Sequence, residues 1–177
     1  MSGQVILQIT GYKNSGKTTL ISSLIPWLKR RGHRVAVIKH DGHDFQMDHT
    51  GTDTSCFIES GAEAALISSP FRMAVLRQRP MELEELIGEV DDCIDWIVVE
   101  GFKQECYPKL VLLSGFQDVS LVGGLSHILA VVVHPDMAKE PQRLQALQQE
   151  AEATVPWFSR EDRNHIFEHL YSQLSIR

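Results

Sequence analysis

The segment Gly11–Thr18 constrains the fold of this chain more than any other feature of its sequence. It reads Gly-Tyr-Lys-Asn-Ser-Gly-Lys-Thr and fits the pattern G-x-x-x-x-G-K-[ST]. The apolar stretch Val5–Thr10 precedes it, and a stretch with leucines at every fourth position, Leu20, Leu24 and Leu28, follows it. Strand, glycine-rich turn and helix in this order are typical of a P-loop, whose backbone N–H groups converge on phosphate oxygens. The alternative, a glycine turn that happens to carry a lysine, does not account for this context.

Each residue of the turn has an expected task. We predict that Lys17 reaches the β- and γ-phosphates of a nucleotide and that Thr18 offers its hydroxyl to Mg²⁺. The helix that begins near Lys17 adds the positive end of its dipole. The predicted nucleotide contacts in this segment are Gly11, Tyr12, Lys13, Asn14, Ser15, Gly16, Lys17, Thr18 and Thr19.

A P-loop needs an acidic partner for its magnesium ion, and Glu100 is the candidate. It follows four apolar residues, Trp96–Val99, which predict a buried strand that ends on a carboxylate. The carboxyl ends of parallel strands form the sheet edge at which ligands bind. We therefore predict that Glu100 and Thr18 hold the metal, that Lys17 and Glu100 serve any hydrolysis, and that Gly101 lets the backbone approach the γ-phosphate. Asp95, at the start of the same strand, should lie at the opposite edge in a structural role.

Short apolar runs alternate with helical patterns along the rest of the chain. This alternation predicts an α/β fold of the P-loop NTPase class, with a mostly parallel sheet between two layers of helices. The 177 residues contain no internal repeat or linker, so we expect one nucleotide-binding domain spanning residues 1–177. The last helix is expected to start at Ser159, which has capping-box spacing to Asp162. Further strands are predicted at Arg34–Lys39, Ala64–Ser68, Lys109–Leu113 and Ile128–Val133, and further helices over Met81–Val90 and before Gly61.

Composition excludes several classes of partner. Seventeen basic and 23 acidic residues give a net charge of −6, which argues against a broad nucleic-acid surface. No apolar run approaches the ~20 residues that cross a bilayer, and the first residues do not resemble a secretory signal. The three cysteines form no C-x-x-C pair, which suits free thiols in a reducing compartment. We expect a cytoplasmic protein that binds neither nucleic acid nor membrane.

The polar stretch after the second predicted strand should reach the same sheet edge. Lys39 and Asp44 are the best candidates there for contact with phosphates or with water bound to Mg²⁺. The alternatives are an ordinary polar loop and a transition-metal site, since imidazoles and carboxylates lie close together in the sequence. The residues concerned are Lys39, His40, Asp41, His43, Asp44, Asp48, His49 and Asp53.

Three blocks of this sequence together resemble the MobB family. The first is the run Gly11–Thr19, the second begins with Ile38-Lys39-His40, and the third is Val99-Glu100-Gly101-Phe102-Lys103. The resemblance spans about residues 4–170. It implies a P-loop α/β homodimer that binds GTP with Mg²⁺ and hydrolyses it slowly at most. It also implies a role in molybdopterin-guanine dinucleotide biosynthesis beside a MobA-type guanylyltransferase, with molybdopterin as a second ligand to consider.

Two departures from related proteins bear on these implications. Tyr12 occupies the position at which members of the wider class often carry a lysine that reaches across a dimer, so Lys13 receives no such role. The chain has no Asn-Lys-x-Asp motif, the usual guanine reader, because its only asparagines are Asn14 and Asn164. Asp136, just after the Ile128–Val133 strand, could accept hydrogen bonds from guanine or could simply form a turn after proline.

Two other functions fit the same motif. One is an ATP-dependent small-molecule kinase or ligase, because phosphoryl transfer rests on positioning and electrostatics rather than on a distinctive catalytic constellation. Arg72, Arg77 and Arg79 would then close over phosphates, although a solvated surface hairpin is the favoured explanation for them. The other is a metal-delivery GTPase, suggested by the imidazoles of His40, His43 and His49.

Overall fold

A computed structural model describes residues 3–41, 51–151 and 154–175. The chain divides into two compact units, one built from Met1–His40 and Ile87–Arg177 and the other from Asp41–Leu86. Each unit is described by itself. The single domain expected above stays a prediction. No helix among the described residues is long and apolar enough to cross a membrane.

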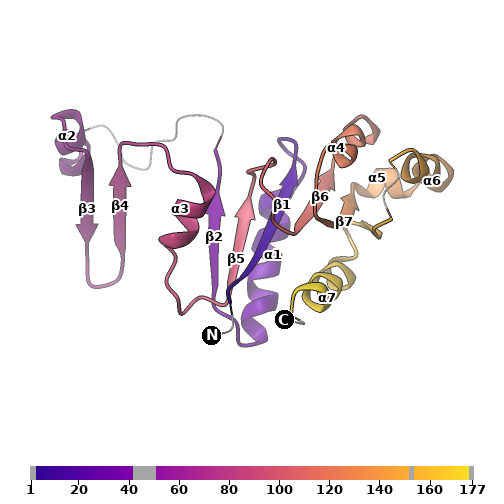
Figure 1. The fold of residues 1–177 in the computed structure, drawn as a ribbon, viewed down its shortest axis with the longest axis horizontal. Coiled ribbons are helices and arrows are strands. Elements are labelled where there is room, and N and C mark those ends of the chain that lie inside the picture. The colour runs from indigo at the N-terminus through magenta and orange to yellow at the C-terminus, as the bar shows by residue number, and fades with distance from the viewer. Residues whose placement is uncertain (1–2, 42–50, 152–153, 176–177) are drawn as a thin grey trace. The chain divides into compact units, whose positions relative to one another are not determined.

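The first unit is built on a six-stranded sheet in which every pair of neighbouring strands is parallel (Figure 1). Parallel strands covered on both faces are expected to be continuously apolar, and all residues of β5 and β6 are buried accordingly. The strand order is β2-β5-β1-β6-β7-β8. The strands are β1 (Val5–Gly11), β2 (Val35–Lys39), β5 (Trp96–Glu100), β6 (Lys109–Leu113), β7 (Ile128–Val133) and β8 (Trp157–Ser159).

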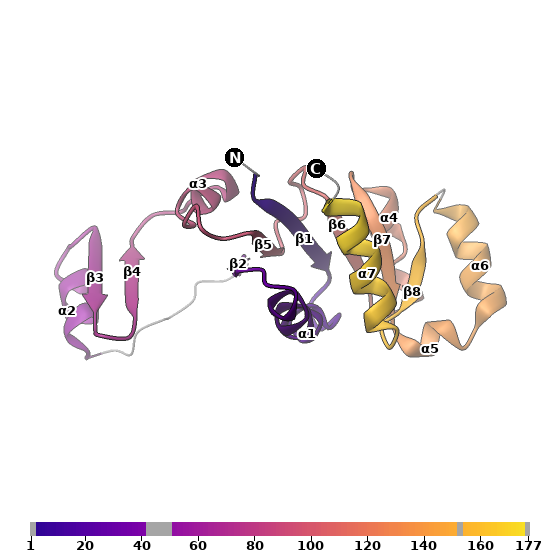
Figure 2. The ribbon, with the colours of Figure 1, turned by 90° about the horizontal axis from the view of Figure 1, so that it is seen from below.

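Helices cover both faces of this sheet, which confirms the predicted three-layer α/β fold (Figure 2). On one face, α1 (Lys17–Arg30) and α7 (Arg163–Leu174) pack on side chains such as Leu7 and Leu112. On the other face, alternate strand residues such as Val111 and Val133 form a second core. The elements over that core are η1 (Phe116–Asp118), α4 (Ser120–Gly123), α5 (Pro135–Ala138) and α6 (Pro141–Glu150).

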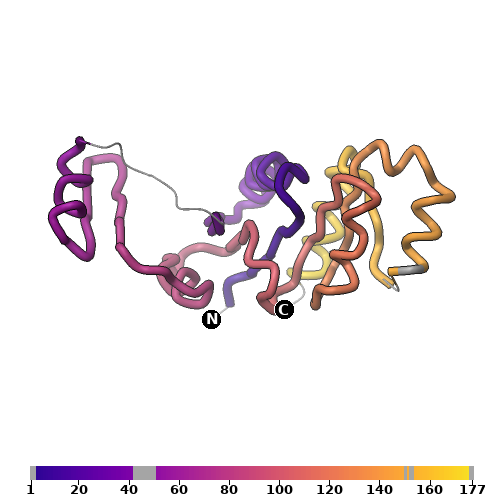
Figure 3. Tube along the Cα trace, turned by 90° about the horizontal axis from the view of Figure 1, so that it is seen from above, coloured from indigo at the N-terminus to yellow at the C-terminus, as the bar shows by residue number. Residues whose placement is uncertain are grey.

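The second unit contains a helix and a hairpin (Figure 3). The helix is α2 (Asp53–Glu59), and the hairpin joins β3 (Ala64–Ser68) to β4 (Met73–Arg77). The expectation of a strand at Ala64–Ser68 is confirmed, but the strand lies outside the parallel sheet and pairs antiparallel with β4. The cause is the short turn after β3, where the Ser69 hydroxyl accepts hydrogen bonds from two turn amides. Such a turn joins antiparallel strands only. The next helix, α3 (Leu83–Gly88), crosses the boundary between the two units.

The last helix starts later than the sequence analysis predicts, so that prediction was wrong. Ser159 ends β8, where it pairs with Val133, and α7 begins at Arg163. The Ser159 hydroxyl accepts a hydrogen bond from the amide of Glu161, so the expected capping box with Asp162 does not form. Tertiary pairing of three residues with β7 outweighs the local capping signal. Helix α1 continues through Pro26 without a break, although a proline there removes one backbone hydrogen bond.

Candidate functional site

The turn between β1 and α1 has the backbone geometry of a phosphate cradle. Gly11 has φ +154°, and a Cβ atom there would lie 2.5 Å from the Leu112 carbonyl oxygen, so no side chain fits. Asn14 and Gly16 adopt left-handed conformations, with φ of 64° and 91°. These conformations turn successive amides toward one side of the loop, which is how backbone nests bind anions. The backbone angles at Gly11, Asn14 and Gly16 therefore fit the expected P-loop, and its contacts with phosphate stay a prediction.

Lys17 folds back over this turn. Its Nζ donates hydrogen bonds to the carbonyl oxygens of Gly11 and Tyr12, at 3.1 and 2.9 Å. Burial lowers the pKa of Lys17 below the ordinary lysine value; the carboxylate of Glu100 opposes this, and the charges of Lys103 and Lys39 add to it. The charges of Lys39 and Lys103 therefore repel the Lys17 ammonium, and an anionic ligand would relieve this repulsion.

Thr18 and Glu100 meet at the predicted metal site. The Thr18 hydroxyl donates to the Glu100 carboxylate, with distances of 3.2 and 3.3 Å to its two oxygens. Glu100 is only 8 % exposed, and parallel pairing places it beside Ile9 on one side and Lys39 on the other. Hydroxyl and carboxylate oxygens are hard donors of the kind that Mg²⁺ prefers, so these residues fit that ion.

The turn after Glu100 is held by a residue that the sequence analysis missed. The Gln8 side chain, fully buried in β1, donates from Nε2 to the carbonyl oxygen of Gly101 at 2.8 Å and also to that of Phe102. Gly101 has φ +98°, and a Cβ atom there would lie 3.0 Å from His40 Cβ, so glycine suits this turn; its predicted approach to the γ-phosphate stays a prediction. A buried glutamine inside an apolar strand was the available signal, because such a group must find partners.

Lysines of the β5–β6 segment also border the turn. Lys103 Nζ lies 4.2 Å from the centre of the Tyr12 ring, a cation–π contact between this segment and the P-loop. Lys109 is fully buried, and its Nζ donates to the Glu105 carbonyl oxygen at 2.6 Å. Lys103 therefore faces the candidate site, whereas Lys109 has a structural role.

Only some of the candidate residues that follow β2 lie in the described part of the chain. Lys39 lies at the end of β2, paired in register with Glu100, and so reaches the expected sheet edge; its predicted contact with phosphates or with water bound to Mg²⁺ stays a prediction. The His40 ring lies 4.6 Å from the Phe102 ring, centre to centre. Asp44, His43, Asp48 and His49 fall outside the described residues, so their predicted roles stay predictions. Within the described ranges, no three His, Cys, Asp or Glu side chains form a group suited to a metal.

Asp136 lies at the start of α5, directly after β7, which is on the opposite side of β1 from β5 in the sheet. Its carboxylate accepts a hydrogen bond from Lys139 Nζ at 2.7 Å and lies 3.4 Å from His134 Nδ1. The hydrogen bond from Lys139 lowers the pKa of Asp136, so the group is a carboxylate at neutral pH. Its position at the carboxyl end of a parallel strand suits a base-binding residue.

Arg160 is a further residue that no motif pointed to. It follows β8, and its Nη1 donates to the carbonyl oxygen of Ser15 at 3.1 Å, although the two residues are 145 positions apart. A Cβ atom at Gly16 would lie 2.5 Å from the same Nη1, so the guanidinium packs directly on the P-loop backbone. The remaining predicted contacts, Tyr12, Lys13, Asn14, Thr18 and Thr19, are exposed, whereas Ser15 is buried.

Comparison with known proteins decides the family. Residues 6–134 match a family model described as MobB, Molybdopterin guanine dinucleotide synthesis protein B. The chain belongs to the MobB family. The match includes the P-loop, Glu100 and the β7 strand that precedes Asp136, whereas Arg160 lies beyond it.

Individual MobB relatives agree with this result. The chain is 41 % identical over 116 residues to the molybdopterin-guanine dinucleotide biosynthesis adapter protein of Haemophilus influenzae, covering 63 % of this chain and 65 % of that protein, which is less than two thirds of its length. It is 35 % identical over 134 residues to the Escherichia coli protein of the same name, covering 71 % and 76 %. The crystal structure of a MobB homolog from Bacillus stearothermophilus superposes with a TM-score of 0.71 at 26 % identity, covering 97 % of this chain and 99 % of that one.

Proposed function

We propose that this chain is an adapter protein of molybdopterin-guanine dinucleotide biosynthesis that binds GTP with Mg²⁺. The pathway and the word adapter come from the names of the Haemophilus influenzae and Escherichia coli relatives. The observation that carries nucleotide binding is the meeting of Thr18 and Glu100 beside a P-loop of the correct backbone geometry.

Each residue of the site has its own role in binding the triphosphate and Mg²⁺. The amides of the P-loop and the Lys17 ammonium bind the β- and γ-phosphates, for which Lys17 exchanges its bonds to the loop carbonyls. Thr18 and Glu100 hold Mg²⁺, which would neutralise charge between the β- and γ-phosphate oxygens. Gly101 and Lys39 border the γ-phosphate side. Hydrolysis is slow in this proposal, because Arg160, which contacts the loop, donates to the Ser15 carbonyl oxygen and is not free to act as an arginine finger.

Guanine selection is assigned to Asp136. Its carboxylate accepts hydrogen bonds from the N1 and N2 groups of guanine, in place of the Asn-Lys-x-Asp motif that the chain lacks. Adenine offers no matching pair of donors, so this contact favours GTP over ATP.

The adapter acts as a homodimer in the cytoplasm beside a MobA-type guanylyltransferase, with molybdopterin as a second ligand to be tested. Dimerisation is supported by the uncovered apolar side chains of the β3–β4 hairpin, among them Leu66 and Met73, each about two-thirds exposed at 68 % and 67 %. The exposed free cysteines Cys56, Cys93 and Cys106 suit a reducing compartment.

Calorimetric titration with GTP and then ATP, with Mg²⁺ present, tests the proposal on the wild type and on Lys17→Ala. Lys29→Ala, at the other end of α1, is the matched control. We expect GTP binding in the wild type and the control, loss in Lys17→Ala, and a smaller preference for GTP in Asp136→Ala. Preference of the wild type for ATP would favour a kinase or ligase, and absence of binding would refute the nucleotide-dependent role.

A further inference from the structure

The guanidinium of Arg160 touches the P-loop from a direction that the phosphates do not occupy. Its bond is to the carbonyl oxygen of Ser15, at 3.1 Å. In a P-loop the amides point toward the bound anion, so a carbonyl dipole at the same turn points away from it. With this bond in place, the Arg160 guanidinium lies at the rim of the cradle, against the backbone of Ser15 and Gly16.

The sheet order defines which end of a nucleotide reaches this rim. Glu100 and Thr18 place the magnesium ion, and with it the γ-phosphate, on the β5 side of β1. β7 and β8 lie on the opposite side of β1. The γ-phosphate and the base lie at opposite ends of an extended nucleotide, so a nucleoside that leaves the P-loop on the side away from Glu100 runs toward β7 and β8. Arg160 is held on that side, because its backbone N–H donates to the Val133 carbonyl oxygen at 3.0 Å.

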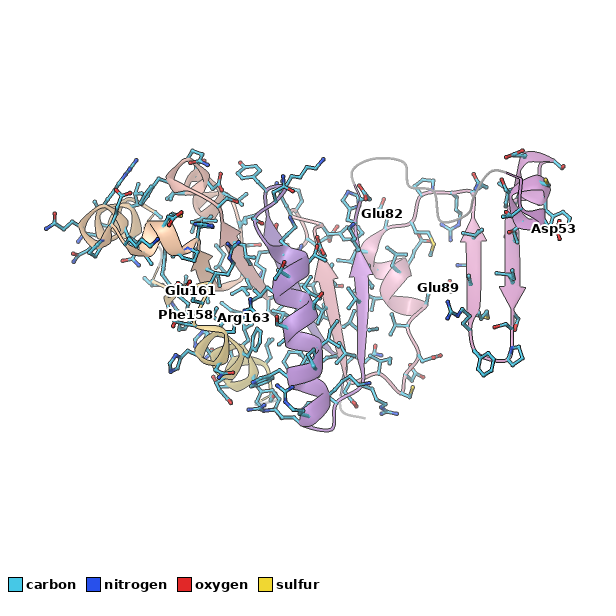
Figure 4. The ribbon with its side chains drawn as sticks, turned by 180° about the vertical axis from the view of Figure 1, so that it is seen from behind. Asp53, Glu82, Glu89, Phe158, Glu161 and Arg163 are labelled. Carbon is cyan, nitrogen blue, oxygen red and sulfur yellow. The ribbon has the colours of Figure 1, made fainter. Side chains whose placement is uncertain are left out.

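The side chain is fixed before any ligand arrives. Backbone pairing with β7 anchors its Cα, and the bond to Ser15 anchors its Nη1. Among the residues that the structure describes, Ser15 is the hydrogen-bond acceptor of this guanidinium, and the bond uses one of its five donors. Figure 4 shows its neighbours Phe158, Glu161 and Arg163 in the segment that leads into α7, next to α1. Planar guanidinium groups stack on aromatic bases, which gives this fixed cation a natural ligand.

We propose that Arg160 binds the nucleoside of the bound nucleotide, with its guanidinium packed against the purine base. This assignment rests on the proposed nucleotide binding and adds to it a residue outside the P-loop. Arg160 forms the wall of the base site next to the P-loop, and the segment with Asp136 follows the neighbouring strand. Stacking does not depend on the identity of the purine, so Arg160 contributes affinity while Asp136 contributes selectivity.

The test measures binding of GTP, GDP and inorganic tripolyphosphate, with Mg²⁺, to the wild type, Arg160→Ala and Arg160→Lys. Arg163→Ala is the matched control, because Arg163 is an arginine three positions on that bonds to Ser23 of α1 at 3.0 Å. We expect Arg160→Ala to weaken GTP and GDP equally, by roughly 3- to 30-fold, the range that a stacked cation contributes. Tripolyphosphate binding should be unchanged, and Arg163→Ala should match the wild type for all three ligands. Arg160→Lys should recover little, because an ammonium group cannot stack as a plane.

Several results would overturn the assignment. Equal loss of tripolyphosphate affinity would mean that Arg160 braces the P-loop or binds a phosphate. A larger loss for GTP than for GDP would place the guanidinium at the γ-phosphate, and full recovery in Arg160→Lys would show that only charge matters. Unchanged nucleotide affinity in Arg160→Ala would refute the contact while leaving the proposed function intact. A wild type that binds tripolyphosphate and no nucleotide would refute both. Thermal unfolding without ligand shows that each variant is folded, and Arg160→Gln replaces the alanine variant if that one is not.

Discussion

The Gln8 side chain donates a hydrogen bond across the sheet edge to the carbonyl oxygen of Gly101, at 2.8 Å. The two residues are 93 positions apart, and the donor is fully buried. The bond fixes the first turn after Glu100, where Gly101 and Phe102 both have positive φ values, 98° and 49°. A non-glycine residue in that region carries conformational strain, which the second bond from Gln8, to Phe102, helps to offset.

Replacement of Gln8 by methionine should therefore destabilise the protein. Methionine keeps most of the volume but leaves the Gly101 carbonyl without its donor, at a cost of about 1–3 kcal/mol in the free energy of unfolding. Urea denaturation measures this loss. The matched control is Gln4→Met, since Gln4 makes an exposed bond to the Asp91 carbonyl oxygen at 3.0 Å. Equal free energies of unfolding for the two variants would show that the buried bond stabilises the protein no more than the exposed one.

Substitution of Glu100 by glutamine should remove the magnesium dependence of GTP binding. The amide keeps the shape and the contact with Thr18 but loses the charge that attracts the ion. We expect affinity in Mg²⁺ to fall by roughly 10- to 100-fold, as for changes near other metal sites. Affinity measured in a chelator should match the wild type. Asp95→Asn is the control, because Asp95 lies at the other end of the strand and pairs with Arg34. A loss that is the same with and without Mg²⁺ would contradict the metal assignment.

The P-loop and its acidic partner could be predicted from the sequence because their determinants are local. Glycines at Gly11 and Gly16 and an apolar run that ends at Glu100 dictate backbone shape and burial over a few residues each. Arg160 could not be predicted in this way. Its contact with Ser15 depends on β8 pairing with β7, and the three residues of β8 carry a weaker pattern than the helix signal at Ser159.

The hairpin shows a related limit. A strand at Ala64–Ser68 was predicted correctly, but its partner β4 was not, because the choice and the direction of the neighbouring strand depend on the turn between them.

Asp95 shows the opposite case. Its predicted structural role holds, because the start of a parallel strand lies away from the ligand edge and its carboxylate caps the Arg34 amide at 2.7 Å. Position along a strand was predictable, whereas the choice of neighbouring strand was not.

The lowered pKa of Lys17 predicts how nucleotide affinity depends on pH. In the free protein, burial makes this ammonium lose its proton at a lower pH than an ordinary lysine. Bound phosphates favour the charged form and raise the pKa again. Binding therefore takes up a proton at high pH, and affinity falls as the pH rises through the pKa of the free protein, while it is unaffected by Lys17 well below that value.

Calorimetric titration of GTP from neutral to alkaline pH measures this effect. Lys17→Arg is the control, because a guanidinium stays charged throughout, and ionisation of guanine weakens both proteins alike. The wild-type affinity should fall more steeply than that of the variant. Parallel curves would mean that the Lys17 ammonium does not lose its proton in this range.

The exposed face of the hairpin predicts that one acidic substitution will dissociate the proposed homodimer. Leu66 and Val75 lie directly opposite each other in the β3–β4 pair, and Met73 lies on the same face. Their exposed fractions are 68 %, 37 % and 67 %, so this apolar face has no cover among the described residues of its own unit. A two-stranded hairpin is marginally stable unless such a face is buried. Contact between two copies of the chain would bury this apolar face of each copy.

Leu66→Asp introduces a charge that would have to be buried between the two copies, which is costly without a partner. We expect sedimentation velocity to show a dimer for the wild type and a single 20.0 kDa chain for this variant. Phe71→Asp is the control, because Phe71 lies in the turn, is 93 % exposed and is outside the paired strands. The Phe71→Asp variant should remain dimeric. Dissociation of both variants would show that the interface includes the turn, and a Leu66→Asp variant that stays dimeric would exclude this face as the interface.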